Sequence, residues 1–236
     1  MRAARWRRNL IGDSLSYLRS IPLPTKKKTK FDIQIDLDVR RTKLVDEDLL
    51  STVLRAYASM NSGFGYAQGM NFIASILLKV YINSTAPDRA VHDAFCSLHT
   101  IITRIRAFYP LSWKDNMPLK IAAASAKLVK LHIEMELNMT LGEHFHLLLR
   151  TLILRHWPCL FANMFLENSE HIWDYLLVNT RSRLFPLTVA MFTQHRTMMR
   201  HLCAEKMFAV IENRHMHPNL LKEALRLDKL GMFSVL

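Results

Sequence analysis

Glycine and cysteine are both scarce in this chain of 236 residues, which contains six glycines and three cysteines. Cys96, Cys159 and Cys203 are widely spaced and odd in number, so we expect neither a disulfide framework nor a cysteine zinc site, and a reducing compartment fits best. Long apolar runs are also missing, because the longest, at about residues 72–78, is far shorter than the roughly 20 residues of a membrane-spanning helix. These absences exclude a disulfide scaffold and an integral membrane protein.

Acidic residues are outnumbered, and the net charge is +12. Such a charge attracts nucleic acid, an anionic membrane or an acidic protein partner. The basic excess is strongest near the start of the chain, in Arg2, Arg5, Arg7, Arg8, Lys26, Lys27, Lys28 and Lys30. An arginine-rich start without acids before Asp13 is also typical of a mitochondrial presequence, and this alternative stays open beside a folded, patterned segment.

Half of the residues are apolar, and after residue 44 their spacing is mostly helical, which predicts an all-α fold. Between residues 44 and 60 the apolar residues recur at steps of three and four. We expect further helices at about 70–81, 90–108, 119–137, 143–157, 169–179, 184–203 and 217–228. The prolines fall between these segments or near their starts, as helix breakers and first-turn residues do: Pro87, Pro110, Pro118, Pro158, Pro186 and Pro218.

One segment departs from the helical period. In residues 31–40 apolar and polar residues alternate strictly, which is the period of a strand or an extended loop. No sheet partner is evident in an otherwise helical chain. Two interpretations stay open. The segment is either a short helix, in which case the period of two is misleading, or an extended functional loop.

Three of the six glycines, Gly63, Gly65 and Gly69, lie within seven residues between two predicted helices. Neither a Walker sequence nor a Rossmann fingerprint is present, so we do not expect a phosphate-binding loop. The glycines indicate either a helix connection with positive φ angles or a backbone that another molecule approaches closely.

The segment Tyr66-Ala67-Gln68-Gly69-Met70-Asn71 resembles the Tyr-x-Gln-Gly-Met-Asn motif of TBC domains, the GTPase-activating modules of Rab-type small GTPases. Upstream, Ile35-x-x-Asp38-x-x-Arg41-Thr42 is similar to the Ile-x-x-Asp-x-x-Arg-Thr motif of that family, and Arg2-x-x-x-Trp6 to its Arg-x-x-x-Trp opening. The motifs occur in the family's order, and a looser similarity in aromatic-rich helices extends over nearly the whole chain.

The resemblance implies an all-α, multi-helix TBC domain over residues 1–236 with two packed helical lobes. The N-terminal lobe would span about residues 1–110 and carry both finger motifs, and the C-terminal lobe about residues 111–236. The implied activity is stimulation of GTP hydrolysis by a Rab-family GTPase in its GTP state. The chain would have no hydrolase site and no cofactor of its own, because the partner GTPase binds GTP and magnesium.

The same resemblance assigns an arginine finger to Arg41 and a glutamine finger to Gln68. This fits the chemistry, since GTP hydrolysis develops negative charge on phosphate oxygens and needs an oriented water. The neighbouring Arg40 could take the place of the finger or only add charge. Residues 43–48 lack the Phe-Pro and aromatic residues that commonly follow this motif, which puts the local loop packing and the choice of GTPase in doubt.

Eight further residues are expected to support the two fingers: Asp38, Thr42, Arg2, Trp6, Tyr66, Gly65, Gly69 and Asn71. Asp38 and Thr42 would fix the finger loop by hydrogen bonds. Arg2 and Trp6 share a helix face and would stack as a support for the finger loops. Gly65 and Gly69 would let the loop press against the GTPase.

No metal site is expected. The histidine pairs 144/146 and 215/217 are two residues apart, which points their rings in different directions, and the aspartates at 32, 36 and 38 lack the glycine turn of a calcium loop.

The alternative function is a catalytically silent TBC scaffold that binds a GTPase or another trafficking partner. A basic helical module for nucleic acid or anionic membrane is the second rival, but nucleic acid is not expected because aromatic residues do not interleave with the charges. We expect a cytoplasmic protein, and peripheral contact with endomembranes stays an open alternative. The lysines at 26–30 could face acidic lipids or the GTPase.

Overall fold

The computed structural model describes residues 1–12, 29–61, 64–110, 114–165, 169–212 and 219–230. These residues form twelve α-helices and one short 3-10 helix, η2 (Arg106–Phe108), with no strand in the described ranges, which confirms the all-α prediction. No helix in the described ranges is long and apolar enough to cross a membrane. Several residues singled out in the sequence lie outside the description: Asp13, Lys26, Lys27, Lys28, Gly63, His215, His217 and Pro218.

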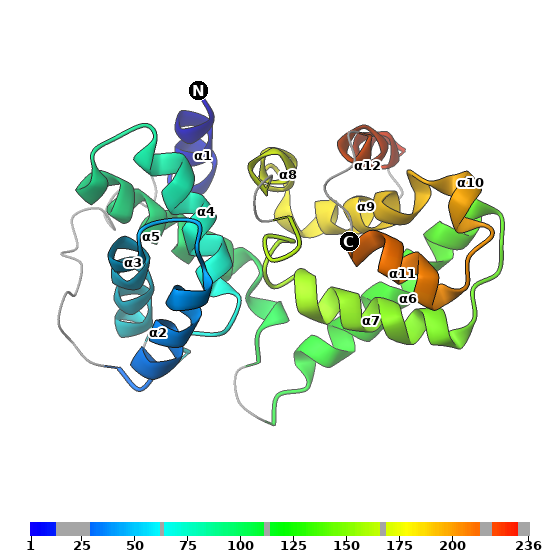
Figure 1. The fold of residues 1–236 in the computed structure, drawn as a ribbon, viewed down its shortest axis with the longest axis horizontal. Helices are drawn as coiled ribbons and strands as arrows, with labels where there is room; N and C mark the ends of the chain where they lie inside the picture. The colour runs from blue at the N-terminus through cyan, green and yellow to red at the C-terminus, as the bar shows by residue number, and fades with distance from the viewer. Residues whose placement is uncertain (13–28, 62–63, 111–113, 166–168, 213–218, 231–236) are drawn as a thin grey trace. The chain divides into compact units, whose positions relative to one another are not determined.

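The chain divides into two compact units (Figure 1). Unit 1 comprises Met1–Arg106 and Pro158–Val178, and unit 2 comprises Ala107–Trp157 and Asn179–Leu236. The sequence prediction placed residues 158–178 in the C-terminal lobe, whereas their contacts lie within unit 1. The physical reason is side-chain packing, since the rings of Trp6 and Trp173 have centroids only 5.7 Å apart.

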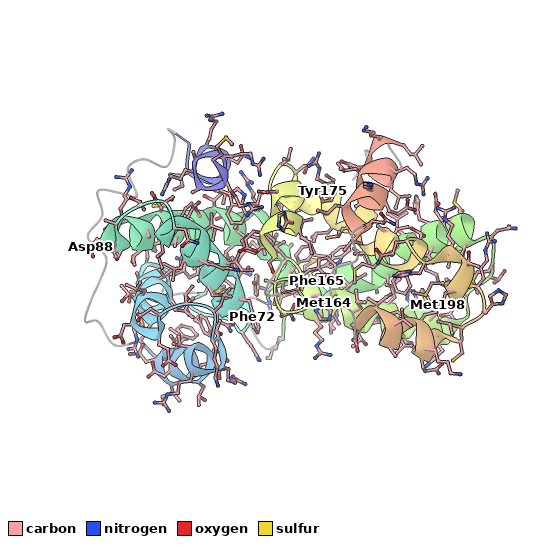
Figure 2. All side chains as sticks on the ribbon, turned by 45° about the horizontal axis from the view of Figure 1, so that its top comes forward. Phe72, Asp88, Met164, Phe165, Tyr175 and Met198 are labelled. Atoms are coloured by element: carbon pink, nitrogen blue, oxygen red, sulfur yellow. The ribbon has the colours of Figure 1, made fainter. Side chains whose placement is uncertain are left out.

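Unit 1 contains six helices: α1 (Arg2–Leu10), α2 (Asp32–Arg41), α3 (Glu47–Met60), α4 (Met70–Ile82), α5 (Pro87–Arg104) and α8 (Ser169–Leu176). Helices α3, α4 and α5 contact one another and supply most of the core, and α2 packs against α3 and α4. Figure 2 draws the side chains on these helices, and it labels Tyr175 of α8, which is buried.

Local sequence explains where the helices of unit 1 begin. Asp46 caps α3 by accepting hydrogen bonds of 3.0 Å from the backbone N–H groups of Asp48 and Leu49. Helix α5 begins at Pro87, whose missing N–H would have no partner in the first turn. Helix α4 begins after Gly69, which has a φ of 103°. Each start matches a signal that the sequence carries.

Unit 2 contains the other six: α6 (Met117–Leu137), α7 (Glu143–His156), α9 (Thr180–Thr193), α10 (Arg196–Met199), α11 (Ala204–Glu212) and α12 (Leu220–Lys229). Helix α6 packs on α7 and α9, and α12 packs on α9. Phe145, Phe192 and Phe208 meet edge to face in the core, with ring centroids 5.2 to 5.3 Å apart. These rings tie α7, α9 and α11 together.

Two predictions for unit 2 were wrong. The single helix expected at 184–203 is divided into α9 and α10, and α9 continues through Pro186, which was expected near a helix start. Burial of nearly every side chain in the second half of α9 outweighs the lost hydrogen bond at the proline. Helix α11 was not predicted, because its apolar residues span only one short stretch.

The alternating segment at 31–40 is helical, which confirms the first of the two interpretations. Ile35 and Val39 are buried at 0% and 4% exposure, while Ile33 and Leu37 are 78% and 50% exposed. Residues four apart share a helix face. The period of two therefore arises from two apolar stripes on opposite sides of α2, and only one of them reaches the core.

Candidate functional site

The carboxylate of Asp38 joins the two central motifs. Asp38 is only 2% exposed, and its Oδ2 accepts hydrogen bonds from Gln34 Nε2 at 3.0 Å and from the Tyr66 hydroxyl at 2.7 Å. Its Oδ1 forms an ion pair with the guanidinium of Arg41. A residue of α2 is thus bonded to the loop that precedes α4, so the two motifs form one structural element.

A second set of hydrogen bonds runs beside the first. The Thr42 hydroxyl donates to the Asp38 carbonyl at 2.7 Å and accepts from Asn71 Nδ2 at 2.7 Å. The Oδ1 atom of Asn71 accepts from the Gly69 N–H at 3.1 Å and lies 3.3 Å from the Tyr66 hydroxyl. We call the buried residues Asp38, Thr42, Tyr66 and Asn71 the motif network. Fully paired buried polar groups of this kind favour one arrangement of the backbone.

Both candidate reacting side chains lie at the surface, next to this buried network. The side chain of Arg41 is 62% exposed at the last residue of α2, and Gln68 is exposed in the turn before α4. Arg41 Nε also donates to the Leu37 carbonyl at 3.2 Å, which directs the guanidinium back along its own helix. The arginine was expected on a loop, and it lies instead at a helix end.

Arg40 is also exposed but differs from Arg41. It has no ion pair with any part of the chain that the structure describes, whereas Arg41 is held by Asp38. Only one of the two arginines is therefore connected to the motif network.

The backbone angles and close packing within unit 1 require glycine at the two described glycine positions of the loop, Gly65 and Gly69. Gly65 and Gly69 have φ angles of 66° and 103°, in the left-handed region that favours glycine. A Cβ on Gly65 would lie 1.8 Å from Cε2 of Phe31, and one on Gly69 would lie 2.7 Å from Sγ of Cys159. Burial raises the pKa of Cys159 to about 12, so this thiol is an uncharged packing group. The interpretation as a helix connection with positive φ angles is correct for both positions.

Arg55 on α3 holds α2 in place, and the sequence analysis gave it no such role. Its Nη1 donates to Asp32 Oδ2 at 2.7 Å and its Nη2 to Asp36 Oδ1 at 2.5 Å. Burial raises the pKa of Asp32, but hydrogen bonds from Thr29 and the charge of Arg55 outweigh it, and the net pKa is lower than usual. The signal in the sequence was the spacing of two aspartates four apart, which places both carboxylates on one helix face.

Arg2 and Trp6 contact α8. Arg2 Nε donates to Asp174 Oδ2 at 3.0 Å, and Trp6 Nε1 donates to Asp174 Oδ1 at 2.8 Å. Burial raises the pKa of Asp174, but the hydrogen bonds from Arg5, Trp6 and Arg2 lower it by more than burial raises it. Its net pKa is therefore below the usual range. These bonds fix α1 against α8, and the finger motifs on α2 and the loop before α4 are held by other residues.

Unit 2 has a polar cluster of a different kind, which we call the charged cluster: Glu136, Arg196, Glu223 and Arg226. Arg226 Nη2 lies 2.6 Å from Glu136 Oε2 and 2.9 Å from Glu223 Oε1. Arg196 pairs with the same two carboxylates. The hydrogen bond from Arg226 is the largest cause that lowers the pKa of Glu223 to about 2. The cluster borders an open groove of about 890 Å³ lined mainly by residues of α10 and α12.

Neither unit offers an evident cation site in the described ranges, where no three His, Cys, Asp or Glu side chains come together to hold a metal ion. In the first histidine pair, His144 has its Nε2 atom 2.8 Å from Glu205 Oε1 at the surface of α7. The aspartates at 32, 36 and 38 are paired with Arg55 and Arg41. Beside the motif network, the described residues present an exposed guanidinium, that of Arg41, and an exposed carboxamide, that of Gln68.

Comparison with known proteins found a matching family model and two relatives. The family model described as the Rab-GTPase-TBC domain matches residues 14–199. Growth hormone-regulated TBC protein 1 of Homo sapiens is 30% identical over 156 residues, which are 64% of this chain and 42% of that protein. The protein of the same name from Rattus norvegicus is 29% identical over 153 residues, 62% of this chain and 48% of that protein. The chain therefore spans less than half the length of each of these relatives.

Proposed function

Because this chain belongs to the Rab-GTPase-TBC domain family, we propose that it stimulates GTP hydrolysis by a Rab-family small GTPase in its GTP state. In this proposal Arg41 and Gln68 act in trans as the arginine and glutamine fingers. The chain needs no cofactor of its own, since the partner GTPase holds GTP and magnesium. Such an activity would end the active state of a GTPase in vesicle trafficking.

The chemistry of the reaction requires the two side chains in question. Hydrolysis of GTP passes through a loose transition state with negative charge on the phosphate oxygens. A guanidinium stabilises that charge, and a carboxamide can orient the attacking water. Because both groups must enter the active site of another protein, they have to be exposed and held by a rigid support.

The observation that carries the proposal is the motif network beneath Arg41 and Gln68. Asp38 binds Arg41 on one side and Tyr66 on the other, and Tyr66 lies two residues from Gln68. A buried network that bonds the end of α2 to the loop before α4 would hold the backbone at Arg41 and at Gln68 in a fixed relation, which catalysis in trans demands.

Arg41 can reach another molecule from its place beside Asp38, because the arginine side chain is 62% exposed while the carboxylate is buried. After the guanidinium turns toward a phosphate, the Asp38 carboxylate keeps its hydrogen bonds from Gln34 and Tyr66. The buried carboxylate would therefore not be left without partners when the finger is in use.

The experiment is single-turnover GTP hydrolysis by a panel of GTP-loaded Rab GTPases, with the wild-type chain, Arg41→Ala and Gln68→Ala. We expect stimulation of one or a few GTPases, and a loss of roughly 10³-fold or more in Arg41→Ala, since an arginine finger contributes about 10³ to 10⁵ in rate. Gln68→Ala should also lose most of the stimulation. Thermal unfolding should be unchanged in both, because exposed side chains pack little core.

Arg40→Ala is the matched control. It removes the same charge as Arg41→Ala, at the neighbouring position, where Arg40 has no ion pair with the described residues. We expect the stimulation to change at most a few-fold. Full stimulation by Arg41→Ala would contradict the assignment of the finger. If the folded chain binds GTP-loaded Rab GTPases and stimulates none, the scaffold alternative replaces the catalytic one.

We also propose a cytoplasmic location with peripheral contact at endomembranes. The net charge of +12 supports this, because anionic leaflets attract basic surfaces. Sedimentation with vesicles that contain phosphatidylserine, compared with neutral vesicles, tests the contact, which should weaken as salt is added.

A further inference from the structure

Helix α2 carries two apolar residues on its outer face, Ile33 and Leu37, which lie outside the core of unit 1. Ile35 and Val39 already bury the inner face of this helix, and Arg55 holds its flank through Asp32 and Asp36. Ile33 and Leu37 face largely away from that packing, since they are 78% and 50% exposed. Because the two side chains are four residues apart on α2, they lie on one helix face and are both accessible to another molecule.

The stripe leads to the proposed finger. Ile33, Leu37 and Arg41 are spaced by four residues, so they lie on one face of α2. The Arg41 side chain bonds the carbonyl of Leu37, one turn back along the helix. Exposed basic residues at 40 and 43 flank this face, which gives it an apolar centre and a charged edge.

Geometry connects the stripe to the same partner as the finger. With a rise of about 1.5 Å per residue, Leu37 lies roughly 6 Å and Ile33 roughly 12 Å from Arg41 along the helix axis. A standard protein interface covers about 800 Å² on each partner, a patch roughly 30 Å across. A protein whose nucleotide receives Arg41 would therefore cover both apolar residues.

We propose that Ile33 and Leu37 form an apolar docking stripe that contacts the surface of the GTP-bound small GTPase next to its nucleotide site. This inference rests on the proposed function, and it adds the residues that determine affinity to those that act on the phosphate. The stripe binds the GTPase in the ground state and the transition state alike, so it sets KM and leaves kcat to the fingers.

The test measures stimulated hydrolysis over a range of chain concentrations for Ile33→Gln, Leu37→Gln and the double variant. We expect KM to rise about threefold for each single variant and about tenfold for the double variant, with kcat within about twofold of wild type, because most interface side chains are worth less than about 1 kcal/mol each. Leu37→Met keeps an apolar side chain and should restore a near-wild-type KM.

Leu147→Gln is the matched control. Leu147 is 53% exposed on α7 of unit 2, so the change has the same chemistry and a similar exposure, and KM should not move. Thermal unfolding of every variant is measured alongside. Should Leu37→Gln unfold, Leu37→Ala removes the same contact in a good helix former.

The outcomes separate the inference from the proposed function. Stimulation by the wild type together with an unchanged KM in the double variant overturns the docking stripe and leaves the fingers standing. A loss of kcat at unchanged KM overturns it too, because the stripe would then act through the finger. If the wild type stimulates no GTPase, the proposed function and the docking stripe fall together.

Discussion

The motif network of unit 1 and the charged cluster of unit 2 are both made of polar side chains that join helices, yet they differ in burial and in what they hold. The four residues of the motif network are at most 5% exposed, and the residues bonded to them include an exposed arginine. In the charged cluster the two arginines are 41% and 42% exposed, and each meets two carboxylates of its own unit.

The difference teaches which of the two can present a reactive group. In the charged cluster each guanidinium pairs with two carboxylates, so the cluster joins α6, α10 and α12. In the motif network the carboxylate of Asp38 has further hydrogen bonds from Gln34 and Tyr66, which it would keep if Arg41 turned toward a partner. Burial fixes the position of the network, and exposure leaves its arginine available.

The largest effect is expected from a substitution that breaks the motif network. Asp38→Ala removes the acceptor of Arg41, Gln34 and Tyr66 and leaves the buried Tyr66 hydroxyl without its main partner. We expect a loss of about 2 to 4 kcal/mol of unfolding free energy and at least a tenfold loss of GTPase stimulation. Chemical denaturation and single-turnover hydrolysis measure the two. Asp38→Asn keeps an acceptor and should lose less stability; an equal loss would mean that the hydrogen bonds are not what matters.

A second change strains the loop that carries Gln68. Gly65→Ala places a Cβ at a φ of 66° and 1.8 Å from the Phe31 ring, which must move. The backbone strain and the displaced ring together should cost about 2 to 3 kcal/mol. Gly142→Ala is the control, since nothing lies within 4 Å of its Cβ position and its φ is −72°. A similar melting temperature for the two variants would show that the Phe31 contact is unimportant.

The charged cluster should respond to pH. The folded pKa of Glu223 is about 2, below its ordinary 4.5, so its stabilisation is complete above pH 4.5 and is lost as the pH falls toward 2. We expect wild type to lose about 1 kcal/mol more than Glu223→Gln between pH 5 and pH 2.5, a figure reduced from the full shift because solvent screens the cluster. Denaturant unfolding at the two pH values measures it, and identical pH profiles would contradict it.

The smallest effect concerns an exposed pair. His144 and Glu205 lie at the surface of unit 2 with side chains 58% and 63% exposed. Glu205→Gln should therefore leave the melting temperature unchanged, since solvent-exposed ion pairs contribute little. A clear drop would mean that the surface pairs of unit 2 matter more than their exposure indicates.

Much of the candidate site could be predicted from the sequence. The motifs single out Arg41 and Gln68, whose role as fingers stays a prediction, and the positive φ angles of Gly65 and Gly69 follow from a glycine cluster between helices. The expected support of the finger motifs by Arg2 and Trp6 is not what their bonds provide, because these go to Asp174, about 170 residues further along the chain. A face on a helix is visible in a sequence, and its distant partner is not.

The sequence by itself determined the helical class, the three motifs and most helix starts, because periodicity, caps and prolines act within a few neighbouring residues. Only the tertiary structure decided that residues 31–40 form a helix with one buried and one exposed stripe, that Asp38 joins Arg41 to Tyr66, and that α8 packs in unit 1. The reason is physical: local patterns fix which residues share a face, and long-range packing fixes what that face meets.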